Sequence, residues 1–310
     1  MQWPTIPLAA TCALLASASA HLQAADDRPS PSPTRFSAEV GIGAEYDSNV
    51  SVDELDASSS ESDYALTMDA KLRLQHQLNP ITDLGFTYDF GQTLYEQFSE
   101  LDRQTHMLGA DVDVDLGKTN AGASFYYINS LLDYDAFLEF YRVSPSLSGF
   151  LAKKWFARGA YVYADKTIED RSERDATSHA GEVDLYFFRR GLRSYFNVGY
   201  RYREEDANGA QYDNRAHSFK LRYVHRFEVM AKVVKMELAW RYEDRDYTSI
   251  TPAIGEERAD ERQRWKLDVE VPVLQHGALQ FYGGYGAYDS NYEPADYSQT
   301  VVGTRFLYRW

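Results

Sequence analysis

Cysteine and long apolar runs are nearly absent from this chain of 310 residues. The single cysteine, Cys12, lies in an N-terminal segment that we expect to be removed, so the mature chain would carry no thiol. A chain without a thiol has no disulfides, no cysteine-ligated metals and no cysteine nucleophile. The sequence also has no glycine-rich phosphate loop, zinc-ligand spacing or dinucleotide fingerprint, so we expect no cofactor and no metal site.

Positive charge is scarce as well. Lys and Arg number 32 against 47 Asp and Glu, which gives a formal net charge of -15. The field of so acidic a molecule repels phosphate, and nucleic acid is therefore not an expected partner.

The first 24 residues contain no Asp, Glu, Lys or Arg, and residues 6–20 form an apolar stretch rich in Ala and Leu. We interpret residues 1–24 as a secretory signal peptide. The alternative is an N-terminal anchor, but the stretch is shorter than the roughly 20 residues of a helical span. Residues 25–35, rich in Pro and Ser, predict a flexible periplasmic tail, and residues 36–310 the folded domain.

Apolar and polar side chains alternate along most of the remaining chain, which is typical of β-strands with one apolar face. The pattern predicts strands near residues 36–46, 64–74, 84–90, 108–116, 121–131, 140–151, 155–165, 179–188, 192–203, 215–227, 233–247, 262–273, 278–288 and 300–310. Short turns near 79–82, 117–120, 152–154, 189–191, 228–232 and 274–277 alternate with longer polar segments near 47–62, 92–104, 131–139, 166–177, 204–214, 248–260 and 289–298.

This alternation predicts an all-β fold, a transmembrane up-and-down antiparallel β-barrel of about 14 strands in the outer membrane of a Gram-negative bacterium. A closed barrel pairs its backbone groups between neighbouring strands and needs no helical apolar run. Water inside the barrel would account for the mean hydropathy of -0.51. A soluble β-sandwich is the alternative, but such long strands, with aromatic residues such as Tyr64 and Trp155 at their apolar ends, argue against it.

The chain ends in GTRFLYRW. Gly303, Phe306, Tyr308 and Trp310 resemble the C-terminal signal by which the barrel-assembly machinery recognises outer-membrane proteins, although that signal usually ends in Phe. The resemblance implies the assembly machinery as a partner during biogenesis. We expect the same stretch to form the last strand and to close against the first.

A second resemblance is carried by EYDSNV, residues 45–50, at the outer end of the first predicted strand. This stretch is similar to the corresponding point in the barrels of surface lipoprotein assembly modifier-type proteins and their uncharacterised relatives. The resemblance covers about residues 36–310 and implies a 14-stranded barrel. It also implies a role in export, with a periplasmic partner or a secreted client.

If the apolar set faces lipid, the opposite set lines the lumen. The acidic members are Asp69, Asp89, Asp111, Asp113 and Asp115. The basic members are Arg193, Arg201, Arg203, Lys220, Arg222, Arg226, Lys235, Arg241, Arg264 and Lys266. We expect the two groups on opposite walls, where they would set up a transverse field that orients polar solutes. The alternative is that these charges only pair with one another, as Lys235, Glu237, Arg241 and Glu243 on one strand could.

The outer segments are expected to be loops without a folded domain or plug. The longest, residues 47–62, is expected to be too short for a large constriction loop or plug, so side chains would narrow the lumen. Acidic loop residues include Asp53, Glu54, Asp56, Glu256, Glu257 and Asp260. We interpret them as a solvated loop face, with divalent cations between lipopolysaccharide headgroups as the alternative.

Hydrolases also occur among such barrels, and TSHAGE (177–182) and RAHSF (215–219) each place a serine beside a histidine. Adjacent residues of a strand face opposite sides, so His179 and His217 should not act on their neighbouring serines. We therefore expect no enzyme, but a channel for polar or charged solutes in contact with lipid and lipopolysaccharide. The alternatives are a translocon for a lipoprotein or envelope polymer and, third, a rim-based hydrolase.

Overall fold

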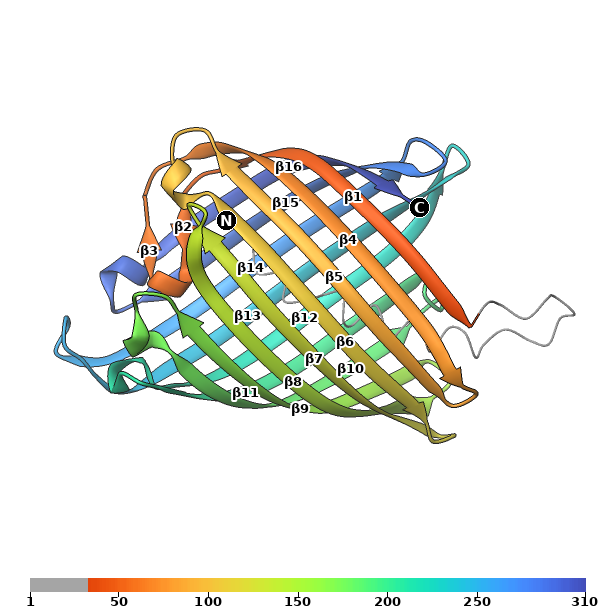
Figure 1. Ribbon diagram of the computed structural model, residues 1–310, viewed down its shortest axis with the longest axis horizontal. Coiled ribbons are helices and arrows are strands. Elements are labelled where there is room, and N and C mark those ends of the chain that lie inside the picture. The colour runs from red at the N-terminus through yellow and green to blue at the C-terminus, as the bar shows by residue number, and fades with distance from the viewer. Residues whose placement is uncertain (1–32) are drawn as a thin grey trace, which may run out of the picture.

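The computed structural model describes residues 33–310, so the predicted signal peptide, Cys12 and most of the predicted tail lie outside the described residues. The described chain forms a closed antiparallel barrel of 14 strands, which confirms the predicted fold (Figure 1). The barrel strands are β1 (Thr34–Asp47), β4 (Asp63–Asn79), β5 (Thr82–Tyr95), β6 (Arg103–Asp115), β7 (Thr119–Leu132), β8 (Asp135–Ala152), β9 (Trp155–Ile168), β10 (Ala176–Phe188), β11 (Ser194–Ala207), β12 (Asn214–Val229), β13 (Lys232–Thr251), β14 (Glu256–Pro272), β15 (Gly277–Ser290) and β16 (Tyr297–Arg309).

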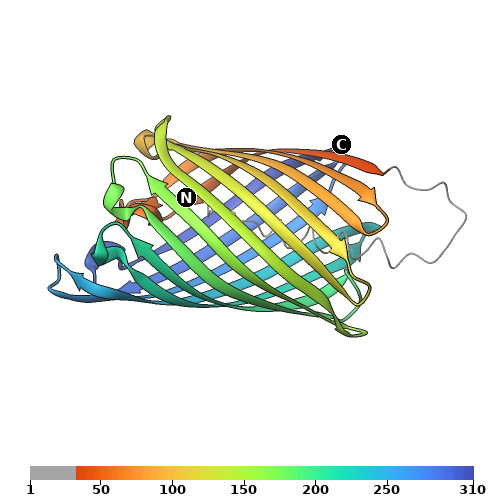
Figure 2. The ribbon, with the colours of Figure 1, turned by 60° about the horizontal axis from the view of Figure 1, so that its bottom comes forward.

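Each barrel strand pairs with its neighbour in sequence, and β1 closes the barrel by pairing with both β4 and β16. Ile42, for example, lies opposite Met68 on one side and Phe306 on the other. The strands run obliquely around the barrel axis, as a closed barrel requires (Figure 2). Because every ladder of the barrel is continued around the ring, none of its 14 strands has an open edge.

The sequence alternation sorts the side chains between the two faces of the sheet. Phe36, Ile42 and Leu108 point outward and are 64%, 53% and 51% exposed, as expected of residues that contact lipid. Their neighbours of opposite parity, such as Glu39 and Asp111, line the interior. Among the described residues, no helix is long and apolar enough to cross a membrane.

The strands are longer than a bilayer requires. The barrel strands range from 13 residues in β6 to 20 in β13, against the 9 to 11 or so of a tilted transmembrane strand. On the outer face, Trp240 and Trp265 pair with ring centroids 5.9 Å apart, and acidic Asp244 and Glu261 continue the same series toward the loops. The barrel wall therefore extends beyond the aromatic girdle into the outer aqueous phase.

Several predicted boundaries were wrong, among them the start of the first strand and the long segments 131–139 and 248–260, because the ladders extend further than the alternation does. β1 begins at Thr34, not at residue 36, because Thr34 pairs with His76. The predicted long segment 131–139 is a two-residue turn, Asp133 and Tyr134, with φ of 50° and 67°. Two consecutive positive φ values match the twist of the flanking strands in a tight hairpin.

Short elements fill the longer outer connections. These are β2 (Ser51–Val52), β3 (Ala57–Ser58) and the single-turn 3₁₀ segments η1 (Asp53–Leu55), η2 (Ser99–Leu101), η3 (Ser172–Arg174), η4 (Ala210–Tyr212) and η5 (Glu293–Ala295). β2, η1 and β3 all lie in the first outer connection, residues 48–62, which we call the mouth loop.

Candidate functional site: the charged lumen and its mouth loop

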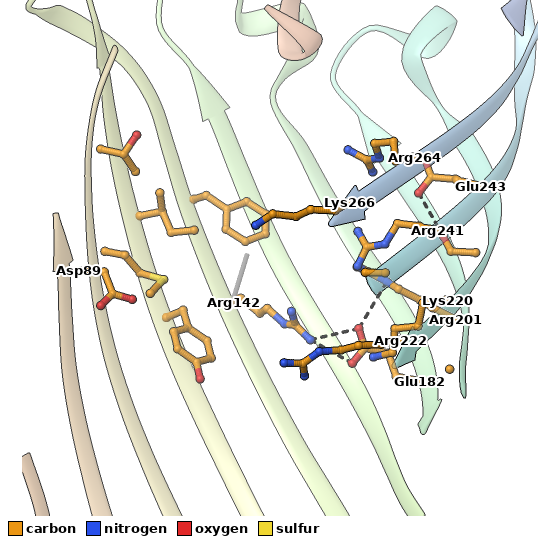
Figure 3. Close-up of a pocket in the computed structure, with 18 of the residues that line it drawn as sticks. Asp89, Arg142, Glu182, Arg201, Lys220, Arg222, Arg241, Glu243, Arg264 and Lys266 are labelled. Atoms are coloured by element: carbon orange, nitrogen blue, oxygen red, sulfur yellow. Dashed lines mark hydrogen bonds and ion pairs between the residues drawn. The ribbon is translucent and has the colours of Figure 1, made fainter. Parts of the chain in front are cut away.

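The barrel encloses a cavity of about 790 Å³. It begins near the periplasmic turns, at Glu39 and Arg309, and ends against Asp53 and Asp56 of the mouth loop. Inward-facing side chains from every part of the barrel wall line it, and Figure 3 shows Asp89 facing a group of basic side chains across this space. The charged lumen is therefore the candidate site.

Four of the five predicted acidic residues line one side of the cavity: Asp69, Asp89, Asp111 and Asp113, on β4, β5 and β6. Asp69 forms an ion pair with Arg305 at 2.8 Å, and Asp89 lies 3.5 Å from the Lys71 ammonium. Asp111 and Asp113 form no ion pair with any described residue. This wall thus keeps negative charge that is not neutralised by direct contact.

Eight of the ten predicted basic residues also line the cavity: Arg201, Arg203, Lys220, Arg222, Lys235, Arg241, Arg264 and Lys266. They lie on β11 to β14. In the strand order of the ring, β7 to β10 separate them from the acidic residues on one side, and β15, β16 and β1 on the other. The two groups therefore occupy opposite walls.

Many of these basic side chains are paired. Arg222 donates two hydrogen bonds to Glu237, at 2.6 and 2.8 Å. Lys235 also contacts Glu237, at 3.4 Å, whereas Glu243 pairs with Arg245 at 2.6 Å. Arg241 lies between these pairs on β13 and forms no ion pair or hydrogen bond with any described residue. Of the pairing foreseen along this strand, only Lys235 with Glu237 is present.

Three cations lie side by side across neighbouring strands. Lys220 of β12 is directly opposite Arg241 of β13, which is directly opposite Arg264 of β14. We call this set the cation row. Like charges directly opposite one another on a sheet destabilise it, so the row is not explained by fold stability. Lys220 reaches Asp184 at 2.6 Å and Arg264 lies 4.0 Å from Asp53, which leaves the central Arg241 facing the cavity.

Three predicted lumen residues do not line the cavity, because they lie where strands meet turns. Asp115 ends β6, and its carboxylate accepts a hydrogen bond from the Gly117 amide at 2.7 Å. Arg193 precedes β11 and donates to the Arg226 carbonyl oxygen at 3.2 Å, while the Arg226 guanidinium donates to the Leu192 carbonyl oxygen. These three residues follow the same alternation as the lumen-facing residues, but their side chains bind backbone groups at the turns.

Sequence reasoning missed charged residues on β8, β9 and β10 that complete the basic wall. Glu182 accepts hydrogen bonds from Arg142 at 3.1 and 3.0 Å and lies 3.8 Å from Arg158 and 3.6 Å from Arg201 (Figure 3). The same parity rule would have found Glu182, because it alternates with outward-facing Val183.

The mouth loop turns into the barrel at the EYDSNV stretch. Asp47 is fully buried, and its carboxylate accepts hydrogen bonds from the Gln299 amide at 2.9 and 2.8 Å and from the Asn49 backbone at 3.0 Å. The Asn49 side chain accepts from the Ser58 hydroxyl at 2.7 Å and donates to the Ser298 carbonyl oxygen at 3.1 Å. These bonds fix the loop to β16 and direct it inward.

Ion pairs hold the tip of the mouth loop against separate parts of the rim. Glu54 pairs with Arg103 of β6 at 2.8 Å. Asp56 pairs with Arg174 of η3 at 2.8 Å and with Arg258 of β14 at 2.9 Å. Since β6 and β14 lie on opposite sides of the ring, the loop tip spans the mouth.

Apolar contacts also hold the tip of the mouth loop against the barrel wall. Val52 is 4% exposed and packs with Phe137 and Ile168, and Leu55 adds to this cluster. The expectation that residues 47–62 are too short for a constriction loop or plug, so that side chains narrow the lumen, was therefore wrong at the mouth of the barrel. The reason is local: β2 and β3 form a small hairpin within residues 48–62, and its tip buries apolar and paired acidic side chains together.

The interpretation of the acidic residues as a solvated loop face is wrong for four of the six. Asp56 is 7% exposed and Asp260 2%, and both contact Arg258. Burial by itself would raise the pKa of the Asp56 carboxyl, but hydrogen bonds and charges from Arg258, Arg174 and Arg262 outweigh burial and hold this pKa well below its ordinary value. Asp53 and Glu54 are half-buried and lie beside Arg264 and Arg103, whereas Glu256 and Glu257 are exposed.

Aromatic side chains crowd the periplasmic end of the lumen beside the basic wall. Phe156, Tyr186, Phe188, Tyr195 and Val224 form a buried cluster on β9 to β12. We did not predict an apolar patch inside the barrel. The signal was available in LYFF (185–188), where four consecutive apolar residues make both faces of the sheet apolar at the periplasmic end of β10.

The histidines near serine face away from the cavity. Ser178 and Ser218 line the lumen, whereas His179 and His217 are exposed on the outer face and hydrogen bond to the Tyr161 and Tyr200 hydroxyls. Neither serine can use its neighbouring histidine as a base. Among the described residues there is also no group of three or more His, Cys, Asp or Glu that could hold a metal ion.

The C-terminal residues Gly303, Phe306, Tyr308 and Trp310 belong to the strand that closes the barrel. Phe306 and Tyr308 lie opposite Ile42 and Val40 of β1, and the Trp310 amide donates to the Ala38 carbonyl oxygen at 2.9 Å. Recognition of these residues by the assembly machinery stays a prediction.

Comparison with known proteins gives the same fold. No protein-family model and no curated protein sequence matches the chain. An anion-selective porin from Comamonas acidovorans superposes with a TM-score of 0.52 at 10% identity, covering 90% of this chain and 100% of the porin. OccAB3 from Acinetobacter baumannii gives 0.49 at 8% identity, covering 89% and 99%, and OmpT, an outer membrane protein of Vibrio cholerae, gives 0.48 at 10%, covering 92% and 100%.

At these identities the likeness is one of fold. The chain is an outer-membrane β-barrel, because a closed antiparallel barrel with an apolar outer belt and a charged interior is the architecture of proteins that span the Gram-negative outer membrane.

Proposed function

We propose that the protein is a passive outer-membrane channel for anionic polar solutes. The observation that carries this proposal is the cation row of Lys220, Arg241 and Arg264 facing the cavity. Three adjacent cations whose central member has no partner among the described residues favour a transient anion in that position. The acidic wall on β4 to β6 would keep the anion on the basic side.

The solute would move along the basic wall by exchange between neighbouring cations. Arg222 of β12 and Lys266 of β14 each lie two residues closer to the periplasmic end than Lys220 and Arg264, on the same face of the sheet. Their own partners, Glu237 and Asp268, make each contact with a solute weak enough to be reversible. Several weak sites in series are what conduction needs.

The test is ion selectivity in planar bilayers. Replacing Arg241→Gln should lower the anion-to-cation permeability ratio roughly twofold, because a unit charge about 8 Å from an ion in water contributes ~0.5 kcal/mol. Arg215→Gln is the matched control, since the Arg215 side chain is 62% exposed and pairs with Glu204 at 3.5 Å outside the cavity. Correctly folded protein that conducts no ions, or selectivity that Arg241→Gln leaves unchanged, would contradict the proposal.

A translocon resembling the surface lipoprotein assembly modifiers is the second candidate. The supporting observation is that EYDSNV, the stretch that carries the resemblance, contains Asp47 and Asn49, whose hydrogen bonds fix the base of the mouth loop. We call these two residues the hinge. Such a protein would act with a separate periplasmic partner. It should co-purify with a surface-exposed client, and deletion of the protein should abolish display of that client.

A further inference from the structure

The tip of the mouth loop places one carboxylate among three arginines, which we call the mouth arginines: Arg174, Arg258 and Arg262. Asp56 lies 2.8 Å from Arg174, 2.9 Å from Arg258 and 3.6 Å from Arg262. Arg258 and Arg262 are 3% and 8% exposed, so this is a built, largely buried site.

The mouth arginines carry more charge than the barrel wall itself neutralises. Asp260 of β14 contacts Arg258 at 2.7 Å and Arg262 at 3.0 Å. Without Asp56, Arg258 and Arg262 would share this one carboxylate, and Arg174 would keep no ion pair with any described residue. Because an unpaired buried charge is strongly unfavourable, the loop can leave only if another anion takes the place of Asp56.

The site is continuous with the lumen. Asp56, Arg174 and Arg262 line the same cavity as the cation row. Arg262 and Arg264 lie two residues apart on the inner face of β14. An anion held at Arg264 therefore lies next to the contacts that keep the mouth loop in place.

We propose that the mouth arginines are a binding site for a carboxylate of the transported solute, and that Asp56 occupies this site when the mouth loop is folded in. Guanidinium groups bind carboxylates through paired hydrogen bonds, as Arg258 binds Asp56, so a solute carboxylate can replace Asp56 with little change in geometry. The solute class is a polar molecule that carries at least one carboxylate, such as a uronate.

Binding of this solute opens the mouth, because the site is available only when the loop has left it. A ligand that binds one state alone shifts the population toward that state. A neutral solute of the same size has no such effect, since it leaves the arginines unpaired. This inference rests on the proposed channel function. It adds the class of solute and the opening of the mouth by that solute.

The experiment is single-channel recording with the full-length folded protein in planar bilayers. Glucuronate is added on the side of the outer loops, and glucose at the same concentration and ionic strength serves as the neutral comparison. We expect glucuronate to raise the open probability about fivefold or more and glucose to leave it unchanged. Equal responses to the two solutes would overturn the proposal.

Two variants separate the Asp56 contact from general effects on the loop. Asp56→Asn keeps the size of the side chain and removes its charge, so the channel should open without ligand and no longer respond to glucuronate. Glu61→Gln is the matched control in the same loop, because Glu61 is exposed and no described contact involves its side chain. A glucuronate response retained in Asp56→Asn would overturn the proposal.

A third variant distinguishes this inference from the proposed function. Residues 50–59 are replaced by Gly-Gly, which removes the loop tip and leaves the hinge at Asp47 and Asn49. If this folded variant conducts anions while the wild type ignores glucuronate, the channel stands and the inference fails. If it conducts nothing, the channel function fails, and the inference fails with it.

Discussion

At the scale of single residues, Gly199 explains how the basic wall accommodates its charges. Lys220 of β12 and Asp184 of β10 form an ion pair at 2.6 Å across β11, the strand between them. Gly199 is the residue of β11 directly opposite both. A Cβ there would lie 2.3 Å from Lys220 Cε and 2.7 Å from Asp184 Oδ1, so only glycine leaves room for the pair.

Gly199→Ala should destabilise the barrel by about 1–3 kcal/mol, because the added methyl group pushes Lys220 away from the buried Asp184 carboxylate. Reversible urea unfolding in lipid vesicles, followed by tryptophan fluorescence, measures the effect. Gly181→Ala is the control: a Cβ at Gly181 of β10 would have no described atom within 4 Å, so stability should not fall. Equal stability of the two variants would show that Gly199 makes no room for the pair.

At the scale of elements, the mouth loop is held by a hinge and by a tip that differ in chemistry. The hinge uses hydrogen bonds of the Asn49 side chain and of the buried Asp47 carboxylate, which accepts from the neutral amides of Asn49 and Gln299. The tip uses ion pairs of Asp56 together with the apolar contacts of Val52. Weakening the contacts of either part should loosen the mouth loop. Only the contacts of the tip should weaken when the charge of Asp56 is removed or when another anion competes for its arginines.

Asn49→Ala removes the hydrogen bonds to Ser58, Ser60 and Ser298, at 2.7, 3.0 and 3.1 Å. Each such bond contributes about 1 kcal/mol, so the mouth loop should become accessible to proteases added on the outer side. Mass spectrometry of limited digests locates the cut. In Asn208→Ala, which removes one hydrogen bond to the Ser172 carbonyl oxygen in a different loop, residues 48–62 should stay protected.

The pH dependence of the tip follows from the lowered pKa of Asp56, whose ordinary value is 3.8. Arg174, Arg258 and Arg262 surround this carboxyl, with Asp260 beside them. A lowered folded-state pKa contributes stability that is complete above the ordinary value and is lost as the pH falls through the lower one. Open probability should stay constant between about pH 8 and 5 and rise only below about pH 4; a transition near pH 6.5 would instead indicate histidine control.

At the scale of the whole molecule, one sheet separates the lipid outside the barrel from the water inside it. Ala123 and Ser124 are neighbours on β7, yet Ala123 is exposed on the outer face and Ser124 faces the lumen directly opposite Asp111. The same added charge should therefore have very different effects at the two positions.

Ala123→Arg should cost about 1–4 kcal/mol, as expected for a cation on the lipid face, and Ser124→Arg should cost little because Asp111 can pair with it. Unfolding in vesicles of defined composition measures both, and each variant serves as the control for the other. Similar destabilisation of the two would contradict the assignment of faces.

The barrel, its approximate strand number and the two faces of each strand are predictable from the amino-acid sequence, because period-two alternation is a local property. The sequence also placed Asp89 and Arg241 on opposite walls, since the order of strands in an up-and-down barrel follows the order in the chain.

The position of the mouth loop and the pairing of charges could not be predicted from the sequence, because both depend on contacts between distant parts of the chain. Asp56 meets Arg258 across 202 residues of chain, and no spacing in residues 48–62 encodes that contact. Likewise, Arg241 is left without a partner among the described residues because Glu243 turns to Arg245 instead. Ion pairing depends on side-chain geometry in three dimensions, and parity along a strand cannot specify it.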